Sequence, residues 1–570
     1  MDSYIKYMNL KYHGKEQSLY FISSESGTQQ LWKMEIDSRE KYKLTDSDQN
    51  IKNFWIEEDH ITVATDYHGN ERNQFHKFDG KDMITLVDQP DCFHHYGEYD
   101  AGKDMYTAIR NHHASSSFEL CSIDGAGTVA VMGEFEAPIH FIHELSEGQL
   151  LLSMDVNNVD QMLMVFDTAS GEVKELPFPQ ARFSSFKFVR DTCLCLSDLG
   201  NGFKNIYEID LEDGTYVKRT GFNWDIEHFK LSKDDRTAIL SCNENGSSLL
   251  YTLDLTTWEV VQMPFKKNGV IHSLSIGRAD DVFLIYSSVD QPHCIYRYSL
   301  DRKDFELIAD NLPAEEVSWR MASYSSFDGT EIPYFIYEAE SGHGAVIHIH
   351  GGPESQARPE FNALYHLLNR AGLCVAVPNI RGSMGYGRTY LEADDREKRL
   401  DAMKDVVELR QHLIDTDHAD SANISVMGRS YGGLMTLLLV THHPDLWTAA
   451  VDIVGISHLR TFLLGTPPWR RSLRAAEYGS IEGQGEFLDD ISPLTRSRDI
   501  TAPLMIFHSH HDSRVPYTES VQMAEALAKS GQDAAFTAYE NEGHTFMHQE
   551  NIDDMNRKIA EFLIGYHTKG

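Results

Sequence analysis

The sequence predicts an all-β seven-bladed β-propeller followed by an α/β domain with a doubly wound, mostly parallel sheet. Two observations lead to this prediction. One unit of short alternating strands and polar turns recurs seven times before residue 312, and strands alternate with helix-like patterns after it. We therefore expect an N-terminal arm or capping segment at 1–17, a propeller at 18–312 and an α/β domain at 313–570.

The repeat has a period of about 44 residues and carries three or four short strands in each unit, which is typical of a propeller blade. A pair of β-sandwiches would not keep this spacing over so long a stretch. Seven units predict a seven-bladed ring. The units begin at residues 18, 60, 104, 149, 192, 237 and 281.

The second half contains continuous apolar runs, as expected for strands that are buried on both faces of a parallel sheet. Helix-periodic stretches separate them, which predicts helices on both sides of the sheet. Active sites in such sheets lie at the carboxyl ends of the strands. The runs are at 345–349, 373–377, 424–427, 449–454 and 504–507.

The composition indicates a soluble protein, with 41% hydrophobic residues and a formal net charge of −36. This charge would repel nucleic acid and anionic membranes, so we expect neither as a partner. The chain shows no secretory signal and no membrane-spanning run, so we expect it in the cytoplasm. The seven scattered cysteines favour buried free thiols. Cys193 and Cys195 would share one strand face, but no second Cys/His pair lies near them, so we predict core residues and neither metal nor cofactor.

The segment Gly428-Arg429-Ser430-Tyr431-Gly432 is the only G-x-S-x-G in the chain, and it lies between a predicted strand and a predicted helix. A sharp strand-to-helix turn lifts a serine hydroxyl clear of the backbone when the neighbouring residues are glycines. The pattern predicts Ser430 as the nucleophile of an α/β-hydrolase domain.

A serine nucleophile needs a base, and in this fold the acid and then the base follow the nucleophile along the chain. Asp512 in HSHHDSRVP and His544 in NEGHTF both follow predicted strands and have this order. We predict that Asp512 orients His544. Asp452 and Asp533 are rival acids, but the first lies inside a strand and the second on a helix-to-strand turn.

Other histidines near these residues have simpler interpretations. His508, His510 and His511 precede Asp512 and could be taken for a metal cluster, but consecutive residues at a strand end diverge to opposite faces. His548 is expected at the surface or behind His544.

The anion that forms during attack needs two hydrogen-bond donors. One is expected from the backbone N–H of Tyr431. The second is expected from Gly352 in the glycine-rich loop His350-Gly351-Gly352-Pro353, which directly follows a strand.

These motifs together resemble the prolyl oligopeptidase family, and the HGGP loop is most similar to its acylaminoacyl peptidase branch. The quoted segments are HGGP, NIRGSMGYG at 379–387, GRSYGG, HDSRVP and EGHTF. The resemblance implies cleavage of short peptides in a cavity between propeller and hydrolase domain, and it implies that Arg514 binds a substrate carbonyl. It also makes a homodimer or larger homo-oligomer plausible. One segment, ADDREKRLDAM, departs from the family pattern of glycines and a tryptophan.

Three aromatic residues, Phe462, Trp469 and Tyr478, are candidates for the substrate side-chain pocket, although such residues are as often core. Glu57 and Glu58 do not match the acidic motif of dipeptidyl peptidases well, and we interpret them as a solvated turn.

Three function classes remain at this stage. The first is a peptidase that releases N-acylated or free N-terminal residues from short peptides. The second is a carboxylesterase or small-amide hydrolase, including one that inactivates a peptide-like antibiotic. The third is a catalytically inactive propeller scaffold, which is disfavoured because every triad position is filled.

Overall fold

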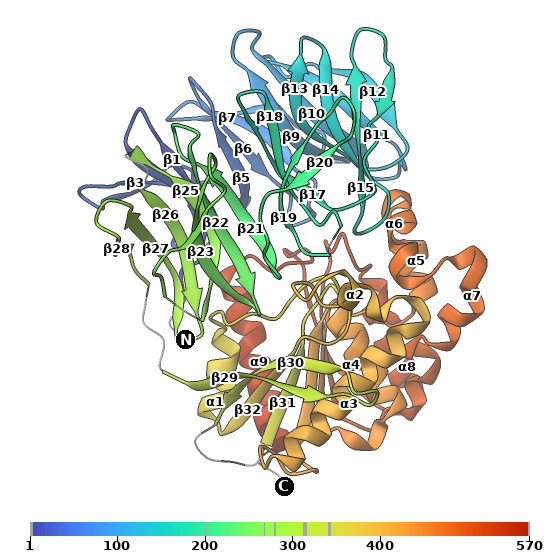
Figure 1. Cartoon of the computed structure of the whole chain (residues 1–570). Coiled ribbons are helices and arrows are strands. Elements are labelled where there is room, and N and C mark those ends of the chain that lie inside the picture. Colours follow the sequence, from blue (N-terminus) through green and yellow to red (C-terminus); the bar gives the residue numbers. More distant parts are fainter. Residues whose placement is uncertain are drawn as a thin grey trace.

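The computed structural model describes residues 4–200, 202–266, 268–278, 281–311, 316–339, 342 and 344–567. The propeller, coloured blue to green, lies over the α/β domain, coloured yellow to red (Figure 1). The predicted boundary between residues 312 and 313 lies outside the described residues.

Seven four-stranded antiparallel sheets form the propeller, and each is built from four consecutive strands. The prediction of seven blades is confirmed. The strands are β1 (Tyr7–His13), β2 (Ser18–Ser23), β3 (Gln30–Glu35), β4 (Lys41–Lys43), β5 (Ile51–Ile56), β6 (Ile61–Thr65), β7 (Gln74–Phe78), β8 (Met83–Val87), β9 (Cys92–Asp100), β10 (Met105–His112), β11 (Phe118–Asp124), β12 (Val129–Phe135), β13 (Ile139–Ser146), β14 (Gln149–Asp155), β15 (Gln161–Asp167), β16 (Val173–Glu175), β17 (Phe183–Val189), β18 (Thr192–Ser197), β19 (Asn205–Ile209), β20 (Tyr216–Lys218), β21 (Asp225–Leu231), β22 (Thr237–Glu244), β23 (Ser247–Asp254), β24 (Val260–Gln262), β25 (Gly269–Ile276), β26 (Val282–Ser288), β27 (Gln291–Ser299) and β28 (Asp304–Ala309).

Burial within a blade follows the position of the strand. The second strand has a neighbour on each side and a blade against each face, so β2, β6 and β26 are buried at every position. The fourth strand is at the outer edge, and β16 and β20 are exposed throughout. This gradient explains why the second strands carry the continuous apolar runs that marked the repeat.

The prediction of an arm or cap at 1–17 is wrong for residues 7–13. These residues form β1, the first strand of the first blade, and pair with β2. A register shift between Met8 and Lys11, with Asn9 at φ 52°, breaks the alternation that identifies strands in a sequence. β1 lies beside β25 of the last blade, where the Leu10 N–H donates to Ser273 Oγ at 3.0 Å. The strand was not predicted because the bulge interrupts the alternation of buried and exposed residues.

The second domain is built on one eight-stranded sheet with the order β29-β30-β32-β31-β33-β34-β35-β36. The first two pairings are antiparallel and the remaining five are parallel, which confirms the predicted mostly parallel sheet. The strands are β29 (Ser318–Ser325), β30 (Glu331–Glu338), β31 (Gly344–Ile349), β32 (Leu373–Pro378), β33 (Ile424–Arg429), β34 (Ala450–Ile453), β35 (Leu504–Ser509) and β36 (Ala535–Tyr539).

Helices cover both faces of this sheet. One apolar core contains side chains of α3, α4 and α8, and a second contains side chains of α1 and α9. The cavity described below is lined by α6. The helices are α1 (Ala363–Arg370), α2 (Arg388–Leu391), α3 (Arg399–Asp415), α4 (Tyr431–His442), α5 (Leu459–Gly465), α6 (Pro468–Tyr478), α7 (Ile481–Asp490), α8 (Thr518–Lys529) and α9 (Gln549–His567).

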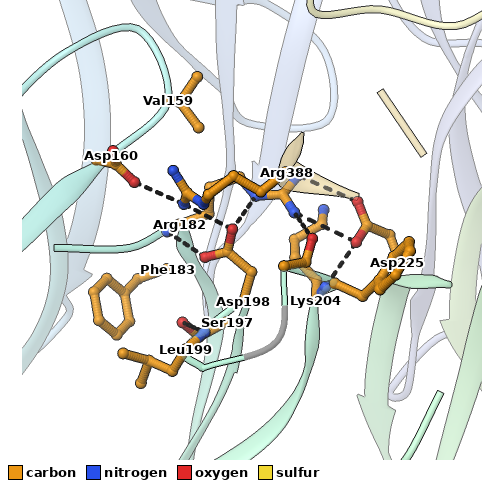
Figure 2. Close-up of polar contacts among 12 residues, drawn as sticks. Val159, Asp160, Arg182, Phe183, Ser197, Asp198, Leu199, Lys204, Asp225 and Arg388 are labelled. Atoms are coloured by element: carbon orange, nitrogen blue, oxygen red, sulfur yellow. Dashed lines mark hydrogen bonds and ion pairs between the residues drawn. The ribbon is translucent and has the colours of Figure 1, made fainter. Parts of the chain in front are cut away.

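Ion pairs join the two domains at several points. At one of them, Arg388 of α2 enters the propeller, where its Nη2 lies 2.7 Å from carboxylate oxygens of both Asp160 and Asp198 (Figure 2). Arg182 bridges Asp198 to Asp225 in the same cluster. Asp198 is buried, so Arg388 of the α/β domain supplies a counter-ion to a buried carboxylate of the propeller.

Two further expectations concern cysteines and membranes. All seven cysteines are buried and free, as predicted. Among the described residues, no helix combines the length and the apolar character needed to cross a bilayer.

Candidate active site

Ser430 occupies the sharp turn between β33 and α4. Its backbone has φ 57° and ψ −116°, a strained conformation for a non-glycine residue. The glycines around it are sterically required. A Cβ at Gly428 would lie 2.1 Å from the carbonyl oxygen of Gly432, and a Cβ at Gly432 would lie 2.1 Å from that of Ile349. Around this turn the ends of β31 and β33 and the start of α4 approach so closely that only glycine fits at Gly428 and Gly432.

Asp512 and His544 lie in the loops after β35 and β36, and they are in contact. Nδ1 of His544 is 2.8 Å from Oδ2 and 3.0 Å from Oδ1 of Asp512. A carboxylate can only accept, so Nδ1 carries the proton and Nε2 is left as an acceptor. The backbone N–H groups of Arg514 and Val515 each donate to Asp512 Oδ1 at 2.8 Å.

Both groups are buried, and burial affects their ionisation. Burial opposes the charge of Asp512, but the neighbouring His544 holds the pKa of this carboxyl below its usual value. Burial lowers the pKa of His544 below its ordinary 6.5, despite the opposing effect of Asp512. The lowered pKa favours the neutral form of His544, which is able to accept a proton.

Two residues that the sequence analysis did not identify hold the His544 loop. Buried Glu542 accepts hydrogen bonds from the backbone N–H groups of Met547 and His548, at 2.8 and 3.0 Å. Arg429, which precedes the nucleophile, donates to the carbonyl of His544. The x of G-x-S-x-G thus links the Ser430 turn to the His544 loop.

The loop with the predicted second anion donor lies next to the nucleophile. Gly351 and Gly352 line the same cavity as Ser430. A Cβ at Gly351 would lie 3.5 Å from Ser430 Cβ, so this loop packs on the elbow. His350 braces the loop, with Nε2 2.8 Å from Ser383 Oγ. Gly352 has φ 126°, which only glycine adopts readily.

The segment that departs from the family pattern packs behind Tyr431. The Tyr431 hydroxyl donates to Asp394 Oδ2 at 2.6 Å, and Arg399 lies over the Tyr431 ring at 5.1 Å. Arg399 is fully buried and also pairs with Glu477. ADDREKRLDAM therefore contributes a buried polar support for the residue whose N–H is predicted to stabilise the anion.

A cavity of about 590 Å³ opens in front of these residues, and most of its charged lining was not foreseen from the sequence. Six of its residues come from one face of α6, which begins at Pro468 and ends at Gly479 with φ 98°. The only signal in the sequence that these six residues lie together is their helical spacing, which does not show what the face contacts. The lining residues are Asn158, Gly351, Gly352, Glu354, Ser355, Arg429, Ser430, Ile456, Phe462, Trp469, Arg470, Leu473, Arg474, Glu477, Tyr478, Arg514, Val515 and His544.

Arg514 lines the cavity and also forms an ion pair with the propeller. Its Nε donates to Glu71 Oε1 and Oε2 at 2.8 and 3.1 Å. Glu71 also accepts from Ser513 Oγ at 2.7 Å. In the same propeller loop Gly69 touches Gly543, because a Cβ on Gly69 would lie 2.8 Å from the Gly543 nitrogen. One propeller loop therefore contacts the segments that carry Asp512 and His544.

The three aromatic candidates all line the cavity. Phe462 is buried and meets the Tyr478 ring edge-on at 5.5 Å. Trp469 meets Phe118 of the propeller edge-on at 5.3 Å, so it belongs both to the cavity wall and to the domain junction.

None of the rival residues lines the cavity. Asp452 is enclosed in β34, where burial raises its pKa to about 7, and Asp533 is exposed on another surface. His508 is hydrogen-bonded to Ser520 Oγ at 2.7 Å, while His510 stacks on Tyr517 and His511 on His68. The three histidines thus diverge. His548 contacts Glu542, and Glu57 accepts from Tyr96 at 2.7 Å, away from the cavity.

Comparison with known proteins identifies the domain that carries the site. Residues 359–569 match the prolyl oligopeptidase family. This segment is a prolyl oligopeptidase family domain. The chain is 27% identical to dipeptidyl aminopeptidase BIII of Pseudoxanthomonas mexicana over 299 residues, which are 49% of this chain and 43% of that protein. It is 30% identical to dipeptidyl peptidase family member 6 of Caenorhabditis elegans over 407 residues, 64% of this chain and 54% of that protein.

The alignments span about half the length of these curated relatives. Solved structures share the fold over nearly the whole chain. A puromycin hydrolase has a TM-score of 0.87 at 15% identity and covers 98% of this chain and 94% of its own. The acylaminoacyl peptidase of Pyrococcus horikoshii has a TM-score of 0.73 at 17% identity, with 98% and 95% covered. The fold of a propeller followed by an α/β-hydrolase domain is therefore shared with these proteins.

Proposed function

We propose that this protein is a serine peptidase of the prolyl oligopeptidase family that hydrolyses short peptides and releases N-acylated or free N-terminal residues. The observation that carries the proposal is the contact between His544 Nδ1 and Asp512, beside Ser430 in one cavity. Relatives named dipeptidyl aminopeptidase and dipeptidyl peptidase support peptide substrates.

The reaction begins when His544 Nε2 takes the proton of the Ser430 hydroxyl as Ser430 Oγ attacks the substrate carbonyl carbon. Asp512 stabilises the imidazolium that forms. The backbone N–H groups of Tyr431 and Gly352 donate to the developing oxyanion. His544 then gives its proton to the leaving amine, and an acyl-enzyme on Ser430 remains. A water molecule, activated by His544, hydrolyses this ester.

The position of the cavity supports small substrates. Its wall includes Asn158 of the propeller and Trp469 of α6, and the Trp469 ring packs against the propeller. A folded protein would have to separate the two domains before a peptide bond could reach Ser430, whereas a short peptide fits a cavity of this size.

A substrate panel tests the proposal. Purified enzyme and the Ser430→Ala variant are assayed with acetyl-amino-acid anilides, free amino-acid anilides and short acyl nitrophenyl esters. We expect anilide hydrolysis by the wild type alone. Turnover of esters without any anilide would contradict the peptidase assignment. A fluorophosphonate probe that labels neither protein would instead support the inactive scaffold.

A second candidate is a carboxylesterase or small-amide hydrolase, because the same triad serves it and the cavity would accommodate a small amide. The shared fold of a puromycin hydrolase makes puromycin a useful member of the panel. A kcat/KM for puromycin that exceeds those of all the peptide anilides would favour this candidate.

A further inference from the structure

The α6 side of the cavity carries more positive charge than the neighbouring carboxylates neutralise. Arg470 and Arg474 are four residues apart, so they project from the same face of α6, and both line the cavity beside Arg514. Glu71 is the carboxylate that pairs with this group. It lies 3.2 Å from Arg470 Nη2 and also binds Arg514. One carboxylate thus serves two arginines.

Arg474 has no carboxylate partner among the described residues. Its Nη1 donates to Thr466 Oγ1 at 2.9 Å and to the carbonyl of Arg514 at 3.1 Å, and its guanidinium lies over the Phe462 ring at 4.5 Å. These neutral contacts position the group without neutralising it. Burial and the nearby charge of Arg470 lower its pKa to about 10, so it remains a cation at neutral pH.

Arg470 also has unused hydrogen-bonding capacity. Its Nε is buried and has no hydrogen-bond partner, while the guanidinium lies against the Trp469 ring at 4.8 Å. A buried donor without an acceptor is unfavourable, and a ligand oxygen that reaches it would remove this penalty.

The other acidic residues of the cavity do not neutralise these arginines. Glu477, which also belongs to α6, is paired with the buried Arg399. Glu354 accepts from the Asn158 amide, and burial raises its pKa. Arg429 adds a further cation to the lining. The cavity is therefore locally positive in a chain whose net charge is −36.

We propose that Arg470 and Arg474 bind a carboxylate of the substrate, which makes the enzyme selective for short peptides or acylated amino acids that carry a negative charge near the scissile bond. The carboxylate belongs either to an acidic side chain or to the peptide's own C-terminus. It forms charge-assisted hydrogen bonds with the guanidinium groups and supplies the missing counter-ion. The inference rests on the proposed hydrolase function.

Two matched pairs of substrates test it and separate the two sources of the carboxylate. The first pair is acetyl-Glu and acetyl-Gln anilide, which differ in one side-chain charge. The second is acetyl-Ala-Ala as the free acid and as the amide, with hydrolysis followed by release of the amine. We expect the charged member of one pair to be preferred by about 100-fold in kcat/KM, mainly through KM.

Variants identify the residues responsible. In Arg474→Gln we expect the preference of the charged over the neutral substrate to fall to within about threefold of unity. Arg474→Lys, which keeps the charge, should restore part of the preference. Arg557→Gln removes an exposed arginine of α9 and serves as the control for net charge. Labelling of each variant by a fluorophosphonate verifies that its active site is folded.

The outcomes are distinguishable. If the wild type hydrolyses neutral and charged members of both pairs equally, the carboxylate site is wrong while the hydrolase assignment stands. If the preference survives in both Arg474→Gln and Arg470→Gln, another residue binds the carboxylate and the inference is overturned. If no substrate is hydrolysed and no probe reacts, the proposed function itself fails.

Discussion

The proposed catalytic residues and the wall opposite them are assembled in different ways. Ser430, Asp512 and His544 lie in loops that follow three parallel strands of one sheet, and their immediate contacts come from the hydrolase domain. The wall that carries Arg470 and Arg514 depends on the propeller, because both arginines pair with Glu71. We infer that one domain supports the chemistry and both domains together shape substrate selection. Five experiments test whether the two parts of the site depend on different domains.

The largest effect is expected for Ser430→Ala. Without the nucleophile, kcat should fall by about 10⁶-fold, since a triad without its serine retains only the contribution of binding and the oxyanion donors. The unfolding temperature should change little, because a methyl group fits where the hydroxymethyl was. Residual activity within tenfold of the wild type would show that a different residue is the nucleophile.

Asp512→Asn should reduce kcat by about 10⁴-fold. The amide would no longer hold the proton on His544 Nδ1, so the imidazole would often present the wrong tautomer to Ser430. Steady-state kinetics with an anilide measures the loss. As a matched control, Asp533→Asn changes an exposed aspartate outside the cavity and should leave kcat unchanged.

Glu71→Gln tests the contribution of the propeller. We expect kcat/KM to fall by about 30-fold, because Arg470 and Arg514 lose their shared carboxylate and repel each other across the cavity wall. Glu306→Gln, which removes an exposed ion pair with Arg39, is the matched control in the same domain. An unaltered kcat/KM in Glu71→Gln would mean that the hydrolase domain builds the wall alone.

The pH dependence reports on the catalytic loops. His544 must be neutral to act as a base, and burial lowers its pKa below 6.5. In the wild type kcat/KM should therefore rise with pH and reach half its maximum below pH 6.5. It should fall about tenfold for each further pH unit on the acid side. A midpoint above 7 would contradict a desolvated His544.

The smallest effect on catalysis is expected at the junction in Figure 2. Arg388→Gln leaves the buried carboxylate of Asp198 with fewer cations, so the unfolding temperature should drop by about 5 °C. We expect kcat to stay within about twofold, because Arg388 does not line the cavity. Differential scanning calorimetry and kinetics, with Arg557→Gln as control, separate the two effects. A loss of kcat/KM as large as in Glu71→Gln would show that any contact between the domains supports the site.

Much of the fold could be predicted because its signals are local. The second strand of each blade is buried on all sides, so it appears as a continuous apolar run at a constant interval. The strand at residues 7–13 was missed because a bulge at Asn9 breaks the alternation. The number of blades was thus predicted correctly, but each predicted unit begins at the second strand of a blade instead of the first.

The same distinction applies to the site. Ser430, Asp512 and His544 can be proposed from the sequence because a strand-to-helix turn requires a glycine pattern and the fold sets the chain order. Arg470 and Arg474 escaped notice because an arginine on a helix is usually a solvated residue. Nothing within a few positions of them indicates that they face a cavity.

The blade repeat and the parallel sheet can be predicted from the sequence, and so can the chain order of the proposed triad, since each signal lies within a few neighbouring residues. Which residues face Ser430 depends on how the whole chain folds. The pairing of Glu71 with Arg514 joins positions 443 residues apart, and the support of Tyr431 by Asp394 joins positions 37 apart. Such contacts form through packing and charge neutralisation in the folded chain, and they leave no periodic pattern in the sequence.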